Sequence, residues 1–165
     1  MCRVALGAPE HSTPAIVPDV RAKLDGDQWV ISGQKSQWVS LGTIATHSLA
    51  FLSVDPQKGM AGNGVCIIPL QQPGVSKGPA LNKLGQRPLN QGELFFDDAR
   101  VPLDHMLVGP EMYEMYVDGI LAIANALMGA AFTGVARAAF EEALAYSKTR
   151  IQGGKPLCEH QLIQK

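Results

Sequence analysis

The sequence predicts a mainly β domain, a barrel or sandwich of about 100 residues, followed by one long helix and the start of a second. Short apolar runs separated by Gly- and Pro-containing turns fill the first two thirds of the chain. From about residue 111 to residue 150 proline is absent, and apolar residues recur at three- and four-residue steps. A Gly-Gly pair and a further helix start follow. We therefore expect a β domain over residues 1–108 and the first part of an incomplete helical domain over residues 109–165.

Composition excludes several classes of function. The 165 residues carry 14 basic and 15 acidic side chains, and no basic stripe indicates a nucleic-acid partner. No apolar run approaches the roughly 18 residues of a membrane span, and the first residues lack a secretory signal. The three cysteines are widely spaced and the four histidines are scattered, so we expect no metal site and no disulfide framework. This cysteine usage favours a reducing cytosol.

The β domain begins after a Pro-punctuated segment over residues 1–19, whose small residues suit either a close backbone approach or an ordinary surface loop. A hairpin is predicted over residues 20–40, because the Asp25-Gly26 pair accepts the positive φ angles of a tight turn between apolar runs. Further strands are predicted over residues 48–54, 65–70 and 93–102.

The predicted long helix over residues 111–150 has an apolar stripe of the kind that packs against other helices. The stripe comprises Leu121, Ala124, Met128, Ala131, Val135 and Ala138. Three glycines interrupt the helix, each costing about 1 kcal/mol relative to alanine, so close packing must offset the cost. A Gly-Gly pair at 153–154 ends this region, and a second helix begins near residues 159–161. Because neither helix has its partners within the sequence, we expect the chain to be a piece of a larger protein.

The end of the predicted hairpin presents an aromatic ring and a hydroxyl. Trp38 and Ser40 are separated by one residue, so a strand projects both toward the same face. This pair suits a planar heteroaromatic ligand, through stacking and a hydrogen bond. A core or edge-strand tryptophan is the alternative that the pattern leaves open.

Six segments together resemble a known family, in its order and spacing and over essentially the whole chain. They are Ala5–Pro9, the hairpin from Asp25 to Lys35, Trp38–Ser40, Lys83–Arg87, Phe96–Pro102, and Gly134–Arg150 with its continuation to Gln161. The sequence is similar to the middle of acyl-CoA dehydrogenases. The resemblance implies an FAD enzyme that removes a proton from the α carbon of an acyl-CoA thioester while a hydride passes from the β carbon to flavin N5.

The resemblance also implies roles for individual residues. Trp38 would flank the isoalloxazine ring, Val39 and Ser40 would hydrogen-bond near its N5 and O4 edge, and Leu6 and Gly7 would contact its pyrimidine side. Thr13 matches a serine that touches the flavin phosphate or the thioester ligand. The positions that reach the FAD of a neighbouring subunit correspond to Arg150, Gln152, Gly153 and Gln161.

Arginine pairs well with a pyrophosphate, although without the resemblance Arg150 is better explained as a cation complementing a helix C-terminus. The implied partners are an acyl-CoA substrate, electron-transfer flavoprotein as acceptor, and further copies of the chain in a dimer or tetramer. The implied location is the cytoplasm or the mitochondrial matrix.

Some positions depart from the family pattern. Gly7 and Ala8 replace a Thr-Glu pair, Leu89 and Asn90 replace a Ser-Asp pair, and Gly153 replaces a phenylalanine that packs beside the adenine. One extra residue between Lys35 and Trp38 predicts either a β-bulge or an alignment with the family that is shifted by one residue.

We assign no catalytic residue. Ala124 stands where some family members carry the catalytic glutamate, and Asn125 stands in place of an arginine. The adjacent acids Glu141 and Glu142 are typical of a solvated helix face.

Two alternatives remain open beside the dehydrogenase. One is a related flavin oxidase or monooxygenase, and the other is an inactive β-rich binding or oligomerisation module. By itself the chain is expected to be inactive and to hold no flavin tightly.

Overall fold

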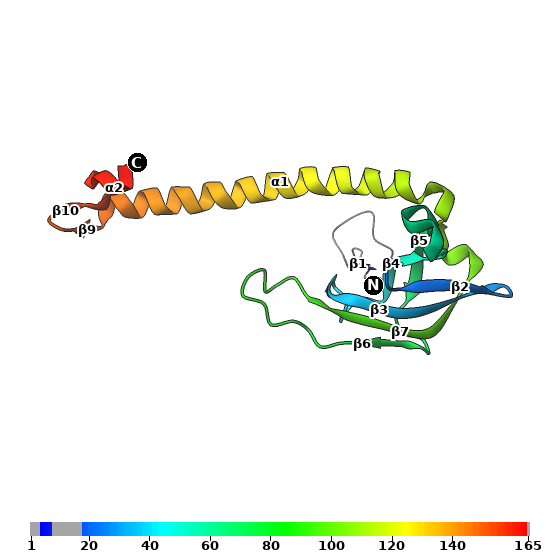
Figure 1. The fold of residues 1–165 in the computed structure, drawn as a ribbon. Coiled ribbons are helices and arrows are strands. Elements are labelled where there is room, and N and C mark those ends of the chain that lie inside the picture. Colours follow the sequence, from blue (N-terminus) through cyan, green and yellow to red (C-terminus); the bar gives the residue numbers. More distant parts are fainter. Residues whose placement is uncertain (1–3, 8–17, 165) are drawn as a thin grey trace. The chain divides into compact units, whose positions relative to one another are not determined.

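The computed structural model describes residues 4–7 and 18–164 and divides into two compact units, Met1–Val117 and Asp118–Lys165. The first unit is built from strands and the start of a long helix (Figure 1). Its strands are β1 (Val4–Gly7), β2 (Arg21–Asp25), β3 (Gln28–Ser40), β4 (His47–Ser53), β5 (Asn63–Pro69), β6 (Val75–Lys77), β7 (Gln91–Pro102) and β8 (Met106–Val108). Short 3₁₀ helices occupy Pro56–Gly62 and Leu103–His105. The long helix, α1, runs from Pro110 to Thr149.

The predicted hairpin is formed by β2 and β3, with the turn one residue later than predicted. Asp25 pairs with Gln28, so the two central turn residues are Gly26 and Asp27 rather than Asp25 and Gly26. Gly26 has a φ of 64°, the conformation that a type II′ turn requires at its first central position. A glycine at this position therefore decides where the chain reverses.

The structure explains why β3 contains a glycine at position 33. Gly33 has a φ of 128°, and a Cβ there would lie 2.7 Å from the carbonyl oxygen of Asp19 and 2.9 Å from Cα of Val20. The pairing register between β3 and β7 shifts between Ile31 and Gly33. Backbone therefore passes directly against backbone here, and no side chain fits.

The strands form one mixed sheet in the order β6-β7-β3-β1-β4-β5-β8, with β2 pairing both β3 and β4. β1 is antiparallel to β3 and parallel to β4. The fold class, a mainly β domain followed by one long helix and the start of a second, is confirmed. The described pairings leave β6 and β8 at the ends of the sheet, so closure into a barrel stays a prediction. The sequence patterns did not reveal β6 or the central position of β1.

The two faces of β4 belong to different cores. Ala50 and Leu52 lie in the main cluster, whereas Phe51 lies in a smaller cluster with Tyr113 and Val117 from the first turns of α1. The rings of Phe51 and Tyr113 are perpendicular, with centroids 6.3 Å apart. This alternation follows the two-residue period of a strand.

Helix α1 confirms the predicted long helix, and its apolar side chains after Val117 are exposed within the chain. The larger ones include Ile123, Leu127, Phe132, Val135 and Phe140. An 18-residue window of α1 has a mean hydropathy of 1.7, so by length and composition α1 qualifies for crossing a membrane, which our sequence analysis did not expect. A helix packed among other helices passes the same test.

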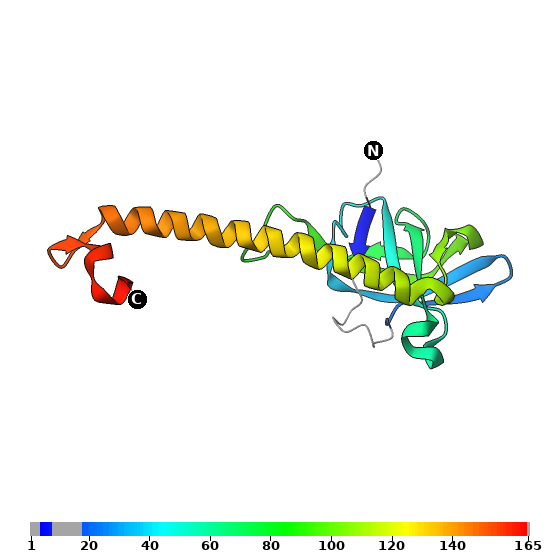
Figure 2. The same cartoon turned by 90° about the horizontal axis from the view of Figure 1, so that it is seen from above.

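The second unit ends in a small hairpin and a short helix (Figure 2). The strands β9 (Ile151–Gln152) and β10 (Lys155–Pro156) are joined by Gly153 and Gly154, which have φ angles of 64° and 83°. Positive φ at both turn positions is the requirement of a type I′ turn. A 3₁₀ turn over Leu157–Glu159 then leads into α2 (Gln161–Gln164), as the second helix start predicted.

Candidate functional site

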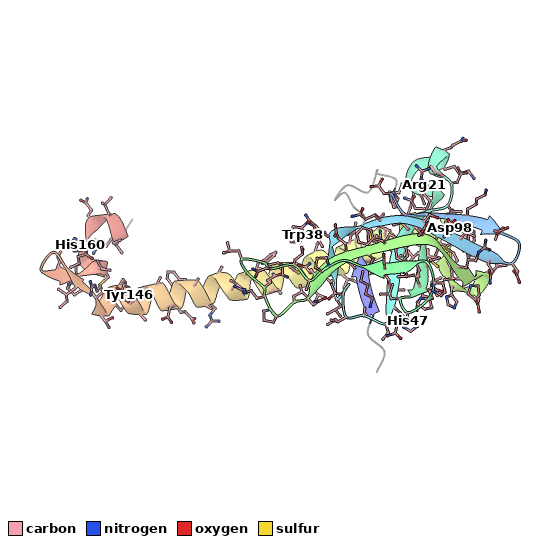
Figure 3. All side chains as sticks on the ribbon, turned by 90° about the horizontal axis from the view of Figure 1, so that it is seen from below. Arg21, Trp38, His47, Asp98, Tyr146 and His160 are labelled. Atoms are coloured by element: carbon pink, nitrogen blue, oxygen red, sulfur yellow. The ribbon has the colours of Figure 1, made fainter. Side chains whose placement is uncertain are left out.

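The candidate site lies at the end of β3, where the exposure of the side chains alternates. Trp38 is 56% exposed, Val39 is buried in the main core, and Ser40 is half-buried. This alternation places Trp38 and Ser40 on the same side of the strand, as predicted, and excludes a core tryptophan. Figure 3 shows Trp38 at the opposite end of the β unit from Arg21 and Asp98.

A β-bulge with two extra residues in β3 precedes this segment. Lys35 pairs with Leu94 and Val39 pairs with Gly92, so four residue steps in β3 lie opposite two in β7. The extra residue between Lys35 and Trp38 had left a bulge and a shifted alignment as alternatives, and the structure has a bulge. The bulge shifts the pairing register and redirects the end of β3.

Strand β1 lies beside the same segment. Leu6 pairs with Ser40 of β3, and Leu6 and Gly7 pair with Leu49 and Ala50 of β4. The backbone of Leu6 and Gly7 is therefore next to Ser40, which brings together five of the predicted site residues. Thr13, the predicted substrate contact, lies outside the described residues.

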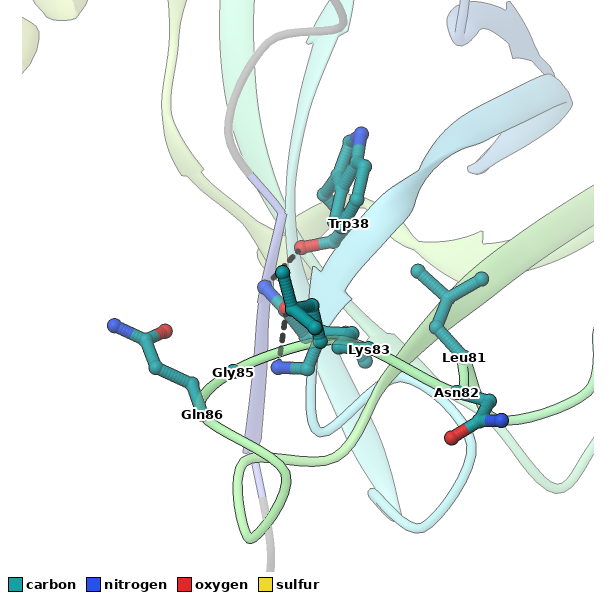
Figure 4. A pocket seen from close by; sticks show the side chains of 8 residues that line it. Trp38, Leu81, Asn82, Lys83, Gly85 and Gln86 are labelled. Carbon is teal, nitrogen blue, oxygen red and sulfur yellow. Dashed lines mark hydrogen bonds between the residues drawn. The ribbon is translucent and has the colours of Figure 1, made fainter.

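Trp38 borders an open pocket of about 790 Å³ (Figure 4). The other lining residues come from the loop after β6 and from the start of β7: Leu81, Asn82, Lys83, Leu84, Gly85, Gln86 and Gln91. Gln91 donates to the backbone carbonyl of Trp38 at 3.2 Å and accepts from Lys83 Nζ at 2.7 Å. The pocket thus combines an aromatic wall with amide groups and one ammonium group.

Asn90 holds the turn that follows Ser40. The amide of Leu41 donates to the carbonyl of Asn90 at 2.8 Å, and Thr43 Oγ1 donates to Asn90 Oδ1 at 2.9 Å. The backbone amide of Thr43 also donates a hydrogen bond to Asn90 Oδ1, at 3.3 Å. Sequence reasoning treated Asn90 only as a departure from the family pattern and did not single out Gln91. Their place directly after the Lys83–Arg87 turn was the available signal.

The remaining predicted residues lie in the second unit, around the β9–β10 hairpin. The carbonyl of Arg150 accepts from the amide of Leu157 at 2.9 Å, and the carbonyl of Gln152 lies 2.9 Å from His160 Nε2. Gly153 turns beneath the ring of His160, and Gln161 opens α2. The structure therefore gathers Arg150, Gln152, Gly153 and Gln161 locally. Their approach to a flavin stays a prediction.

The pocket lining supplies no acid or base from aspartate, glutamate or histidine. Burial raises the pKa of the Cys66 thiol to about 12, and desolvation lowers the pKa of Lys77, but neither residue lines the pocket. Within residues 4–7 and 18–164, no three histidine, cysteine, aspartate or glutamate side chains gather as a metal site. The described residues can stack and hydrogen-bond a ligand, whereas a proton acceptor is absent from this lining.

Comparison with known proteins yields two family matches. The family described as acyl-CoA dehydrogenase, middle domain, matches residues 5–99. The acyl-CoA dehydrogenase C-terminal domain matches residues 116–165. The matches fall on the β domain and on the helical part, in that order.

Relatives and solved structures agree with these matches. A probable acyl-CoA dehydrogenase of Mycobacterium leprae is 32% identical over 99% of the chain, which spans 42% of that relative. The crystal structure of an acyl-CoA dehydrogenase from Geobacillus kaustophilus superposes with a TM-score of 0.87 at 27% identity, over 99% of this chain and 44% of that one. A glutaryl-coenzyme A dehydrogenase in complex with glutaryl-CoA gives a TM-score of 0.83 at 28% identity, over 97% and 41% of the two chains. The chain thus spans less than half the length of the proteins it matches.

Proposed function

Because the chain belongs to the acyl-CoA dehydrogenase family, we propose that it forms the β domain and first helices of an FAD-dependent enzyme that introduces an α,β double bond into an acyl-CoA. Members of the family are flavoproteins. Bound FAD would accept the hydride that leaves the β carbon of the thioester. The chain's own contribution is to bind and orient the flavin and to exclude water from one side of it.

The exposed pair at the end of β3 carries this proposal. The Trp38 indole offers a flat apolar surface to one side of a tricyclic ring, and Ser40 lies on the same side of the strand with its hydroxyl partly accessible. The backbone of Leu6 and Gly7 runs next to Ser40, where amide and carbonyl groups can meet the polar edge of the ring. Val39 is buried and anchors the segment, so only its backbone is available to the ligand.

The second unit would serve a flavin bound to another copy of the chain. Arg150 is exposed directly after α1, and its planar guanidinium suits a pyrophosphate. Gln152, Gly153 and Gln161 surround the same hairpin and would complete the contact. This arrangement requires a homo-oligomer, a dimer or tetramer, in the assembled enzyme.

The base that removes the α proton would come from a part of the protein outside this chain. Among the described residues, the pocket lining contains no carboxylate, and Ala124 occupies the position in α1 where some family members carry the glutamate. We further propose electron-transfer flavoprotein as the acceptor, no membrane span or nucleic-acid partner, and a cytoplasmic or mitochondrial matrix location.

Anaerobic titration of the full-length protein with acyl-CoA thioesters tests the function. We expect a protein-bound flavin that bleaches with at least one chain length, while the isolated 165-residue chain purifies colourless. An FAD-containing protein that no acyl-CoA bleaches would rule out the dehydrogenase. A stoichiometric flavin spectrum from the isolated chain would instead contradict the expected dependence on the other helices.

A flavin oxidase or monooxygenase is the second candidate, because the Gly7-Ala8 pair, the Leu89-Asn90 pair and Asn125 depart from the family pattern. Rapid reoxidation of the substrate-reduced flavin by air would favour this candidate over the dehydrogenase. Persistence of the reduced flavin in air, with reoxidation by electron-transfer flavoprotein, would exclude it.

A further inference from the structure

We propose that Asn90 and Gln91 form a clamp that positions Trp38 and Ser40 for the ligand. Asn90 immediately precedes β7 and Gln91 is its first residue. Gln91 contacts β3 at Trp38, and Asn90 contacts the turn that follows Ser40. Neither residue is assigned a role by the sequence or by the family match. The clamp itself does not depend on the proposed function, whereas its role in presenting a flavin-binding face does.

The Gln91 side chain acts on the first residue of the exposed pair. In the bulge between Lys35 and Val39 the ladder register is broken, and the Gln91 amide nitrogen donates to the Trp38 carbonyl at 3.2 Å. The amide oxygen of Gln91 accepts from Lys83 Nζ at 2.7 Å, so both ends of the amide are engaged (Figure 4). A side-chain donor therefore holds the Trp38 peptide within the bulge and restricts its orientation.

Asn90 acts after the pair, at a strained residue. Leu41 has a φ of 61°, a left-handed conformation that leucine rarely adopts, and its amide is held by the Asn90 carbonyl at 2.8 Å. The Asn90 side-chain oxygen receives the Thr43 hydroxyl at 2.9 Å. A Cβ at Gly92 would overlap Thr43 Cγ2, which shows how closely the start of β7 packs against this turn.

The clamp accommodates one departure from the family pattern. Asn90 stands where an aspartate is usual, and the atom that it uses toward Thr43 is an oxygen acceptor, which either residue provides. An Asn90→Asp variant should therefore keep the clamp, whereas Asn90→Leu removes the acceptor at similar volume. Gln91→Glu keeps an acceptor for Lys83 Nζ but loses the donor that serves the Trp38 carbonyl.

Amide hydrogen exchange in the 165-residue chain tests the clamp without flavin. Asn90→Leu should speed exchange at Thr43, and Gln91→Glu at Val39, by roughly three- to tenfold, the value of one neutral hydrogen bond. In a Trp29→Phe background, Gln91→Glu should also change the acrylamide quenching of Trp38. The Asn90→Asp variant should show the same exchange rates at Val39 and Thr43 as the unmodified chain. The Gln34→Leu control should show them too, although it removes the 3.1 Å hydrogen bond to Glu93 between the same two strands.

Unchanged exchange rates at Val39 and Thr43 would overturn the clamp. An equal rise in exchange rate at every amide, with a lower midpoint of urea unfolding, would also overturn it, because it indicates global destabilisation. If Asn90→Leu does not fold, Thr43→Val removes the hydroxyl donor and the same exchange measurement decides.

In the full-length protein, Gln91→Glu and Asn90→Leu should weaken FAD binding roughly fivefold. Altered exchange with unaltered FAD affinity would overturn the positioning role. Absence of any flavin binding would count against the proposed function and leave the exchange result to decide the clamp.

Discussion

The buried ammonium group of Lys35 donates a 2.8 Å hydrogen bond to the backbone carbonyl of Phe51. Lys35 lies in β3 between the residues paired with β2 and the residue paired with β1, and Phe51 lies in the corresponding interval of β4. The Lys35 side chain therefore bridges β3 and β4 in the interval between the pairings with β1 and the pairings with β2. Because the Phe51 ring packs edge-on against Tyr113, this contact lies next to the start of α1.

Replacing Lys35 with alanine should lower the free energy of unfolding by about 3 kcal/mol, because it leaves both a cavity and a buried carbonyl without this donor. Urea unfolding followed by circular dichroism measures the change. Lys23→Ala, at an exposed position in β2, is the control and should change stability by less than about 0.5 kcal/mol. Equal stability of the two variants would show that the Lys35–Phe51 bridge contributes nothing.

Gly33→Ala should destabilise the β unit by more than about 2 kcal/mol. Its φ of 128° is a glycine conformation, and the added Cβ would meet the backbone of Asp19 and Val20. Gly85→Ala is the matched control, because a Cβ at Gly85 would meet no atom within 4 Å. Thermal unfolding of the two variants side by side decides, and a Gly33→Ala variant as stable as Gly85→Ala would contradict the close backbone contact.

Cys66 should make stability fall at alkaline pH. Burial raises its pKa from 9.0 to about 12, so between these values the folded state keeps a proton that the unfolded state releases. The contribution of the protonated thiol is complete below pH 9 and declines by about 1.4 kcal/mol per pH unit above it. Urea unfolding at pH 8, 9 and 10 should show this extra decline relative to Cys66→Ala, and parallel pH dependences would refute it.

Trp38→Leu in the full-length protein should weaken FAD binding roughly tenfold through the loss of ring stacking. Fluorescence titration of the flavin-free protein with FAD measures the affinity. Trp29→Phe is the control, since the Trp29 side chain packs against the main core and does not line the pocket. If both variants bind FAD as tightly as the unmodified protein, the Trp38 indole does not contact the flavin.

Local sequence patterns predicted much of the fold. Alternating residues and the glycine of the hairpin turn located β2 and β3, and the proline-free repeat located α1 to within one residue at each end. The pattern also placed Trp38 and Ser40 on one side of β3, because a strand has a two-residue period whatever surrounds it. The Gly153-Gly154 pair marked the end of the long helix region, whereas the β9–β10 hairpin that these glycines turn was not predicted.

The resemblance to a family added the identity of the ligand, which composition and periodicity do not encode. It directed attention to Leu6 and Gly7, and the register of β1 with β3 then brought their backbone beside Ser40. It treated position 90 only as a substitution, because a list of matching motifs does not show which atoms touch.

The sequence by itself determined the order of the main elements, the approximate place of the hairpin turn, and the face on which Trp38 and Ser40 lie, because these depend on neighbours along the chain. The tertiary structure alone decided that β1 lies between β3 and β4, that the bulge in β3 contains two extra residues, and that Asn90 and Gln91 hold the exposed segment. Trp38 and Gln91 are 53 residues apart in sequence, and Thr43 and Asn90 are 47 apart. Contacts over such separations depend on strand register and packing, which local patterns do not specify.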